Sequence, residues 1–186
     1  NVIEGLRSEG LENEIQQLTS DDFIKQDEIH CLFSGEQAIG LFAFSWMDIG
    51  YQAIRDQSYF AEYYPKDVLD HLIEKGNLLV MTMGQMMVHP EWRRSKIGPC
   101  VSEIVLGVAV KRFSESTASV LLTFTRNNRG TQDVCARHGA VVLLENHITY
   151  GTASNIMGIF PANIEKTSIP GIDDAMNKLW DEKIIG

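Results

Sequence analysis

Hydrophobic residues recur along the chain with two periods, and these predict a protein of mixed helices and strands. Apolar positions spaced as on helical faces predict helices at 1–20, 51–76, 98–113, 128–138 and 172–183. Short apolar runs bounded by turn residues predict strands at 23–33, 38–46, 78–88, 119–124, 140–144 and 155–160. From residue 78 to 144 strands and helices alternate, which predicts a parallel strand pair there.

Turn and cap residues punctuate these runs. Ser34-Gly35-Glu36 predicts the turn of an antiparallel hairpin, and Pro65 divides the helical stretch at 51–76. Gly84 lies inside the strand at 78–88, which suits a bulge or a close approach of another backbone. Asn128 is expected to cap the helix that follows it, and Gly139 to end that helix.

Length and composition indicate one globular domain spanning 1–186, since 44% of the residues are hydrophobic and 22% are charged. Within it, 51–76 forms a helical insertion and 170–186 a C-terminal helical extension. The formal net charge is −9, from 16 Lys and Arg against 25 Asp and Glu. This balance argues against a nucleic-acid partner and weakly favours a cationic one.

Cysteine spacing and hydropathy indicate the redox state and the cellular compartment of the protein. Cys31, Cys100 and Cys135 are an odd number at wide spacings, so we expect reduced thiols and neither a disulfide framework nor a metal site. No apolar run approaches the ~18 residues of a membrane span, and no secretory signal opens the chain. We therefore expect a cytoplasmic protein without a membrane contact.

Residues 86–100 are the most informative segment, because an apolar strand ends in a short basic loop that opens directly into a buried helix. The first N–H groups of a helix are unpaired and its dipole is positive there, so a phosphate is stabilised at that end. Arg93, Arg94 and Lys96 add charged donors, and Gly98 lets the backbone approach closely. The segment predicts an anion site that fits a pyrophosphate; the alternative is a solvated basic turn.

The order of these residues resembles motif A of the GCN5-related N-acetyltransferases. Val88 to Trp92 matches the lead-in, Val-x-Pro-Glu-aromatic, that precedes the family's Arg/Gln-x-x-Gly-x-Gly/Ala. Arg93 matches the first position of that loop and Gly98 its second glycine. Lys96 replaces the first glycine, which adds a cation near the phosphate.

A second segment, 128–140, is similar to motif B of the same family. Asn128 and Gly139 fall at matching positions, while Arg137 replaces a lysine and Ala140 a phenylalanine. Together the two motifs extend the resemblance over 78–145, and the hairpin at 23–46 fits in outline.

The resemblance implies an α/β (α+β) fold with a single mixed, mostly antiparallel twisted sheet. A central parallel strand pair, 78–88 and 119–124, is splayed, and helices flank the sheet. The helical insertion and the C-terminal helix are additions to this plan. The helix at 172–183 either caps the domain or mediates a homodimer.

The co-substrate that the resemblance implies is acetyl-CoA or another acyl-CoA, lying in the gap between the splayed strands, with no metal. Met87 and Val88 would offer backbone groups to the pantetheine arm and the acyl carbonyl. The diphosphate would rest on the loop and the start of the helix, while Pro99 cannot donate. The predicted cofactor-binding residues are Met87, Val88, Arg93, Arg94, Ser95, Lys96, Ile97, Gly98, Cys100 and Asn128.

The usual proton-transfer residues of the family are missing at their places. The tyrosine that protonates the departing thiolate maps onto Cys135, which is either a substitute acid or a packing residue. The strand base maps onto Thr82 or Gly84, and neither takes a proton. Candidate replacements are His89, Glu62, His71, His147 and Tyr150, of which Tyr150 borders the acceptor site in the family.

The function that the resemblance implies is transfer of an acetyl group from acetyl-CoA to a primary amine by direct attack, with a small-molecule or peptide acceptor. One alternative is a catalytically weak acyl-CoA sensor. Another is a long acyl donor, with the methionines of strand 78–88 as its lining. The aromatic residues of the insertion line the acceptor site or an acyl tail, or pack its core: Tyr59, Phe60, Tyr63 and Tyr64.

Overall fold

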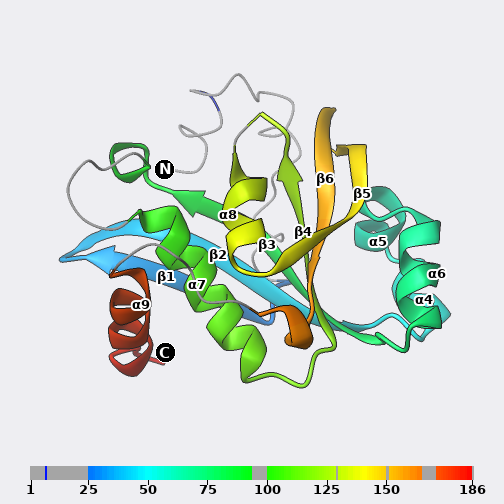
Figure 1. Ribbon diagram of the computed structural model, residues 1–186, viewed down its shortest axis with the longest axis horizontal. Coiled ribbons are helices and arrows are strands. Elements are labelled where there is room, and N and C mark those ends of the chain that lie inside the picture. Colours follow the sequence, from blue (N-terminus) through cyan, green and yellow to red (C-terminus); the bar gives the residue numbers. More distant parts are fainter. Residues whose placement is uncertain are drawn as a thin grey trace.

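A six-stranded sheet forms the centre of the protein, in the order β1-β2-β3-β4-β6-β5 (Figure 1). The structure is a computed structural model and describes residue 7 and residues 25–93, 100–128, 130–149, 151–164 and 171–185. The strands are β1 Glu28–Ser34, β2 Gln37–Asp48, β3 Leu79–Val88, β4 Val120–Arg126, β5 Ala140–Thr149 and β6 Thr152–Ile159. Only β3 and β4 pair in parallel among these strands. The predicted fold class and its central parallel pair are confirmed.

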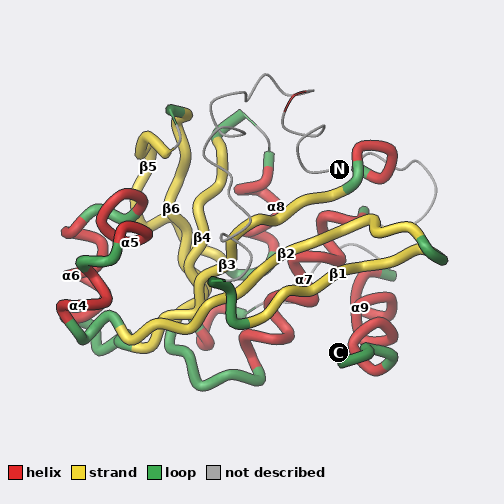
Figure 2. The backbone as a smooth tube through the Cα atoms, turned by 180° about the vertical axis from the view of Figure 1, so that it is seen from behind, coloured by secondary structure: helices red, strands yellow, loops and turns green. Residues whose placement is uncertain are grey.

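Helices cover both faces of the sheet. One face carries α7 Val101–Ser114 and α8 Thr131–Arg137, which lie in front of the strands in Figure 1. The other face carries α4 Gln52–Arg55, α5 Ser58–Tyr63 and α6 Lys66–Glu74, which Figure 2 shows grouped beside β5 and β6. Two short 3-10 helices, η1 Pro90–Trp92 and η2 Pro161–Asn163, follow β3 and β6. None of the described helices is long and apolar enough to span a membrane.

The alternation of side chains along the strands divides the core into two clusters. On the α7 face, Phe44 and Met81 pack against Leu106, and all three side chains are completely buried. On the opposite face, Phe60 of the insertion packs with Leu122, again without exposed surface. Each large apolar side chain buried in this way contributes about 1.5–3 kcal/mol, so the insertion is an integral part of the packed structure.

Several element boundaries differ from those the sequence predicts. The insertion forms three helices, because Pro65 separates α5 from α6 and the chain also turns at 56–57. Helix α7 begins at Val101, since Cys100 has extended backbone angles. Strand β5 continues to Thr149, five residues further than its apolar run. The predicted helix at 1–20 lies outside the described residues apart from residue 7.

The cap predicted for the helix after Asn128 is wrong. Helix α8 begins after Gly130, whose φ of 67° is left-handed, and no side chain caps it. Because a left-handed glycine turns the chain directly before Thr131, Asn128 lies in the preceding turn and outside the cap position. At the other end Gly139 has a φ of +86°, as a helix-ending glycine requires, and a Cβ there would clash with the Asn163 carbonyl oxygen.

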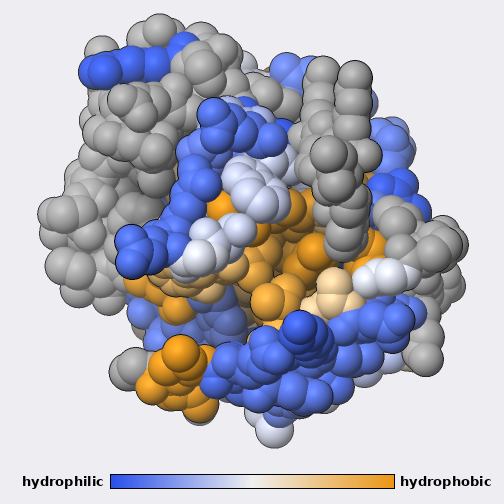
Figure 3. Space-filling model, turned by 90° about the vertical axis from the view of Figure 1, so that its left-hand side faces the viewer, coloured by the Kyte–Doolittle hydropathy of each residue, from blue (hydrophilic) through white to orange (hydrophobic). Residues whose placement is uncertain are grey.

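Helix α9, Ile172–Asp181, packs on α7. Gly107 of α7 leaves room for the Met176 side chain, and the Trp180 indole N–H donates to Glu115. The helix therefore caps the α7 side. Apolar surface remains at this end: Ile184 and Ile185 are largely exposed, and apolar residues lie in a depression bordered by polar ones (Figure 3). The homodimer stays a prediction.

Candidate functional site

The parallel strands β3 and β4 separate after a short stretch of pairing. They pair at Val80–Val120, Met81–Leu121 and Thr82–Leu122, and then each continues without the other. One residue further, the Thr123 hydroxyl donates to the Met83 carbonyl oxygen at 3.2 Å and holds the strands together at the vertex. Beyond it, a Cβ built on Gly84 would meet no described atom within 4 Å. Open space therefore lies over the face of the sheet at Gly84, where the two strands part.

A bulge in β3 lies at the same level as this opening. The register of β2 against β3 shifts between Ala43–Gly84 and Leu41–Met87, and Gln85 has a φ of 55°. A left-handed non-glycine residue is strained by about 1–2 kcal/mol, and the extra residue of a bulge leaves the ladder locally unpaired. The bulge predicted near Gly84 is thus present, with Gln85 as the residue that turns the backbone.

The structure describes the residues on both sides of 94–99, which are Arg93 after β3 and Cys100 before α7. Arg93 follows η1, and its Nε donates to the Val88 carbonyl oxygen at 2.8 Å, which ties the loop to the end of the strand. Cys100 precedes the first residue of α7, with its Sγ 2.9 Å from the Ser102 hydroxyl. By helix geometry the first N–H groups of α7 lie outside its own ladder.

The predicted cofactor-binding residues fall into two groups. Met87 and Val88 pair with Leu41 and Gly40 of β2 and have no strand partner on the β4 side. Asn128 lies in the turn after β4, at the same end of the opening. The second group lies in the loop and outside the described residues: Arg94, Ser95, Lys96, Ile97 and Gly98. The catalytic candidate Tyr150 also lies outside the described residues.

Cys135 lies in the hydrophobic core beneath α8. Its side chain has no exposed surface, and burial, with a smaller effect of the Glu103 charge, raises its pKa to about 12. A thiol with this pKa donates its proton poorly near neutral pH, so the surroundings favour a packing role. Its role as the thiolate acid stays a prediction.

A buried ion-pair cluster joins α7 to α8 beside Cys135. The Glu103 carboxylate, 1% exposed, accepts hydrogen bonds from the Arg137 guanidinium and lies 3.1 Å from the His138 Nε2. Burial lowers the pKa of His138. The sequence does not predict this cluster, because the apolar pattern of 98–113 gives no sign that Glu103 has buried partners. It fixes the two helices that flank the opening.

The insertion covers the face of the sheet that is opposite to α7, near the point where β3 and β4 part. The rings of Tyr63 and Tyr64 lie 6.2 Å and 6.4 Å from that of Phe124, the β4 residue next to the opening. The Thr82 hydroxyl donates to the Ser45 carbonyl oxygen, and burial raises the pKa of neighbouring Tyr59. Of the alternatives for this aromatic group, core packing describes Phe60 and Tyr64, which are buried.

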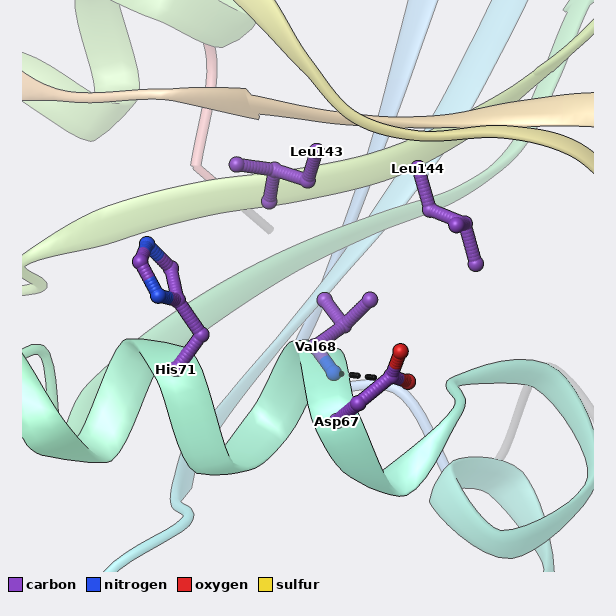
Figure 4. Close-up of a pocket in the computed structure, with 5 residues that line it drawn as sticks. All are labelled: Asp67, Val68, His71, Leu143 and Leu144. Carbon is purple, nitrogen blue, oxygen red and sulfur yellow. Dashed lines mark hydrogen bonds between the residues drawn. The ribbon is translucent and has the colours of Figure 1, made fainter.

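A separate cavity of about 260 Å³ lies between α6 and β5. Figure 4 shows Asp67, Val68 and His71 on the helix, with Leu143 and Leu144 across from them. Leu144 pairs with Ile156, and Ile156 with Phe124. Since two strand spacings amount to ~10 Å, this cavity, and His71 with it, lies to one side of the opening.

The other proton-transfer candidates lie at different distances from the opening. Glu62 is exposed on α5. His89 follows β3, with its Nε2 3.4 Å from the Gln37 amide nitrogen and its buried Nδ1 unpartnered. His147 lies on β5 and pairs with Ser154. None of these candidates is placed between the separated strands within the described part of the chain.

No protein-family model matches the sequence, and no curated protein matches it. Solved structures of the same fold are found nonetheless. FeeM, an N-acyl amino acid synthase from uncultured soil microbes, is 13% identical with a TM-score of 0.57, over 88% of this chain and 86% of that chain.

Two further structures have the same arrangement. One, assigned to a phosphinothricin N-acetyltransferase, is 11% identical with a TM-score of 0.51, over 77% of this chain and 78% of that chain. BjaI, a CoA-dependent acyl-homoserine lactone synthase, is 9% identical with a TM-score of 0.51, over 82% of this chain and 67% of that chain. The chain therefore has the fold of the GCN5-related N-acetyltransferases, as the resemblance of its motifs predicted.

Proposed function

We propose that this protein is an acyl-CoA-dependent N-acyltransferase that moves an acetyl group to a primary amine. The observation that carries the proposal is the separation of β3 from β4 after Thr82–Leu122, with open space at Gly84. A thioester held there lies beside an unpaired strand edge and near the start of α7, which is suited to a diphosphate. The named activities of the three structures of this fold are all acyl transfers.

The reaction needs few protein groups. The lone pair of the neutral amine forms a bond to the thioester carbon, the carbon–sulfur bond breaks, and CoA leaves as a thiolate. The amine proton passes to solvent or to a nearby base, and the thiolate takes up a proton. What the protein supplies is proximity and donors for the carbonyl oxygen. The backbone freed by the bulge at Gln85 is suited to that second task.

A short acyl group fits the opening better than a long one. The Thr123–Met83 hydrogen bond closes the vertex one residue before Gly84, and Phe124 is supported from behind by Tyr63 and Tyr64. A long chain would have to displace these side chains from the packed insertion. This supports acetyl-CoA over a long acyl donor.

The acceptor is a small-molecule or peptide amine, and the net charge of −9 favours a cationic one. Calorimetry with acetyl-CoA, followed by a thiol-release assay over polyamines, aminoglycosides, amino acids and peptides, tests the proposal. Binding together with release above background for one acceptor class is the expected result. Binding without release for every acceptor would favour the acyl-CoA sensor, and the absence of binding would contradict both.

A further inference from the structure

Within the part of the chain that the structure describes, two residues of β5 that lie two positions apart each have a buried polar atom without a hydrogen-bond partner. These are the Nε2 of His147 and the Oγ1 of Thr149, and the Thr149 side chain is 2% exposed. Residues two apart on a strand point to the same face, so both atoms face the same side of the sheet. Because buried polar atoms are almost always satisfied, this pair has the capacity to bind a polar group.

The strand is built so that His147 faces the side of the sheet on which the opening is lined by Gly84 and Phe124. The register of β5 against β6 shifts twice, between Val142 and Leu144 and between Leu144 and His147. As a result His147 pairs with Ser154, which in turn pairs with Arg126 of β4. Paired residues share a face, and Phe124 lies on that face two residues before Arg126.

Hydrogen bonds hold the second bulge in place. Asn146 has a φ of 56°, and its N–H donates to the Asn155 side-chain oxygen at 3.0 Å. The Asn127 side-chain amide donates to the Asn146 side chain at 2.8 Å, and that of Asn155 to Gln132 of α8 at 2.8 Å. The position of His147 is therefore fixed from the turn after β4, from β6 and from α8.

The distance from the opening argues against a direct role in the chemistry. Strands β5 and β4 flank β6, so His147 lies two strand spacings, ~10 Å, from the β4 residue in its row. A group bound at His147 would thus belong to a part of the acceptor remote from the reacting nitrogen. Neither His147 nor Thr149 has a fixed charge, and one hydroxyl can donate to one of these atoms while accepting from the other.

We infer that His147 and Thr149 bind a hydroxyl group of the acceptor amine and select acceptors that carry one about 10 Å from the reacting nitrogen. This rests on the proposed function for the identity of the amine but not for the existence of the polar site. The pair acts on specificity and positioning, and the chemical step is left to the opening between β3 and β4.

The matched probes are 6-amino-1-hexanol and 1-heptylamine, which differ by a hydroxyl in place of a methyl group. With acetyl-CoA, the KM of the amino alcohol is expected to be about fivefold lower, as one or two neutral hydrogen bonds allow. Thr149→Val and His147→Leu should each bring the ratio of the two KM values close to one. Thr125→Val is the matched control, because Thr125 is equally buried but contacts Met157 on the other face.

A binding measurement separates this inference from the proposed function. In the full chain with CoA and ring-labelled histidine, NMR should show the His147 resonance, identified by its loss in His147→Leu, shifting with the amino alcohol and not with heptylamine. A specific shift without acyl transfer would contradict the function and keep the site. Equal shifts for both probes, no shift for either, or a KM preference that survives Thr149→Val would overturn the inference.

Discussion

The His138 Nε2 lies 3.1 Å from a carboxylate oxygen of Glu103, and this contact joins the end of α8 to the first turn of α7 where both side chains are buried. The same carboxylate accepts from Arg137. Since α7 begins at the predicted diphosphate site and α8 follows the strand on the other side of the opening, the contact sets the geometry of both walls.

Removing the Glu103 carboxylate should destabilise the fold. In Glu103→Leu the buried His138 and the half-buried Arg137 lose their partner, and breaking such a pair costs about 3 kcal/mol. Urea unfolding measures the loss. Glu62→Leu, at an exposed position, is the control and should change stability little; a similar loss in both variants would contradict the assignment.

The burial of His138 predicts a loss of stability below neutral pH. Its pKa is lowered from 6.5, mainly by desolvation, so the unfolded chain binds a proton at a pH where the folded chain does not. The stability that the neutral, buried His138 contributes is fully present above pH 6.5, and it is lost as the pH falls through the lowered pKa of the folded state. Unfolding free energies measured from pH 7.5 downward should decline in the wild type and less in His138→Phe. Parallel curves would show that another group is responsible.

Glu28 should produce a second loss at lower pH. Hydrogen bonds from Arg112, and a weaker one from His30, hold its pKa at about 2 instead of 4.5. Because the folded pKa is the lower one, the stabilisation is present above pH 4.5 and is lost between 4.5 and about 2. Arg112→Gln should flatten the stability curve in that window and leave the His138 window unchanged, which acid titration of unfolding would detect.

The anion site is tested by a charge reversal at Arg93 combined with a bulky side chain at Gly98. Arg93→Glu combined with Gly98→Trp should abolish CoA binding, because a carboxylate replaces a cation and an indole fills the loop. Lys111→Glu, in the last turn of α7, provides a matched charge reversal at the far end of that helix. Calorimetry should show that CoA binding is lost in the double variant and kept in Lys111→Glu, and circular dichroism checks that both variants fold. Undiminished affinity in the double variant would remove the site assignment.

The sequence predicts the strands, the parallel pair and the loop that opens into α7, because apolar periodicity and helix-terminus chemistry are local. What it misses depends on contacts between distant segments. Glu103 lies in a helix whose other residues are mostly apolar, and only the structure shows that Arg137 and His138 contact its carboxylate. The bulges of β5 arise from register against β6, so the pairing of His147 with Ser154 has no local signal.

Asn128 shows the converse error, in which a correct residue type is given the wrong position. An asparagine before a helix is a favoured cap, but the left-handed Gly130 moves the start of α8 two residues further along the chain. Cap preferences are weak beside the backbone freedom of a glycine.

Acyl-chain selection should depend on the Phe124 ring, which lies next to the opening. Phe124→Ala removes the side chain between the opening and Tyr63, so hexanoyl-CoA should gain about tenfold in kcat/KM relative to acetyl-CoA if the acyl group lies there. Phe33→Ala, at an exposed position on β1, controls for loss of an aromatic residue. An unchanged ratio would place the acyl group elsewhere.

Variants of Cys135 distinguish a packing role of its thiol from a role as the catalytic acid. Its thiol is buried among the apolar residues of the α7 face and has a pKa of about 12, so Cys135→Ala should cost about 1 kcal/mol of stability and leave kcat nearly unchanged. Cys135→Ser gives the complementary measurement: a buried hydroxyl destabilises more than a methyl group in an apolar site, yet it retains a proton. If the thiol protonates the departing thiolate, Cys135→Ala should instead lower kcat by roughly a hundredfold, with Cys135→Ser intermediate. A pH profile of kcat that loses its alkaline limb in Cys135→Ala would assign the acid to this residue, whereas identical profiles would leave the thiolate to be protonated by solvent.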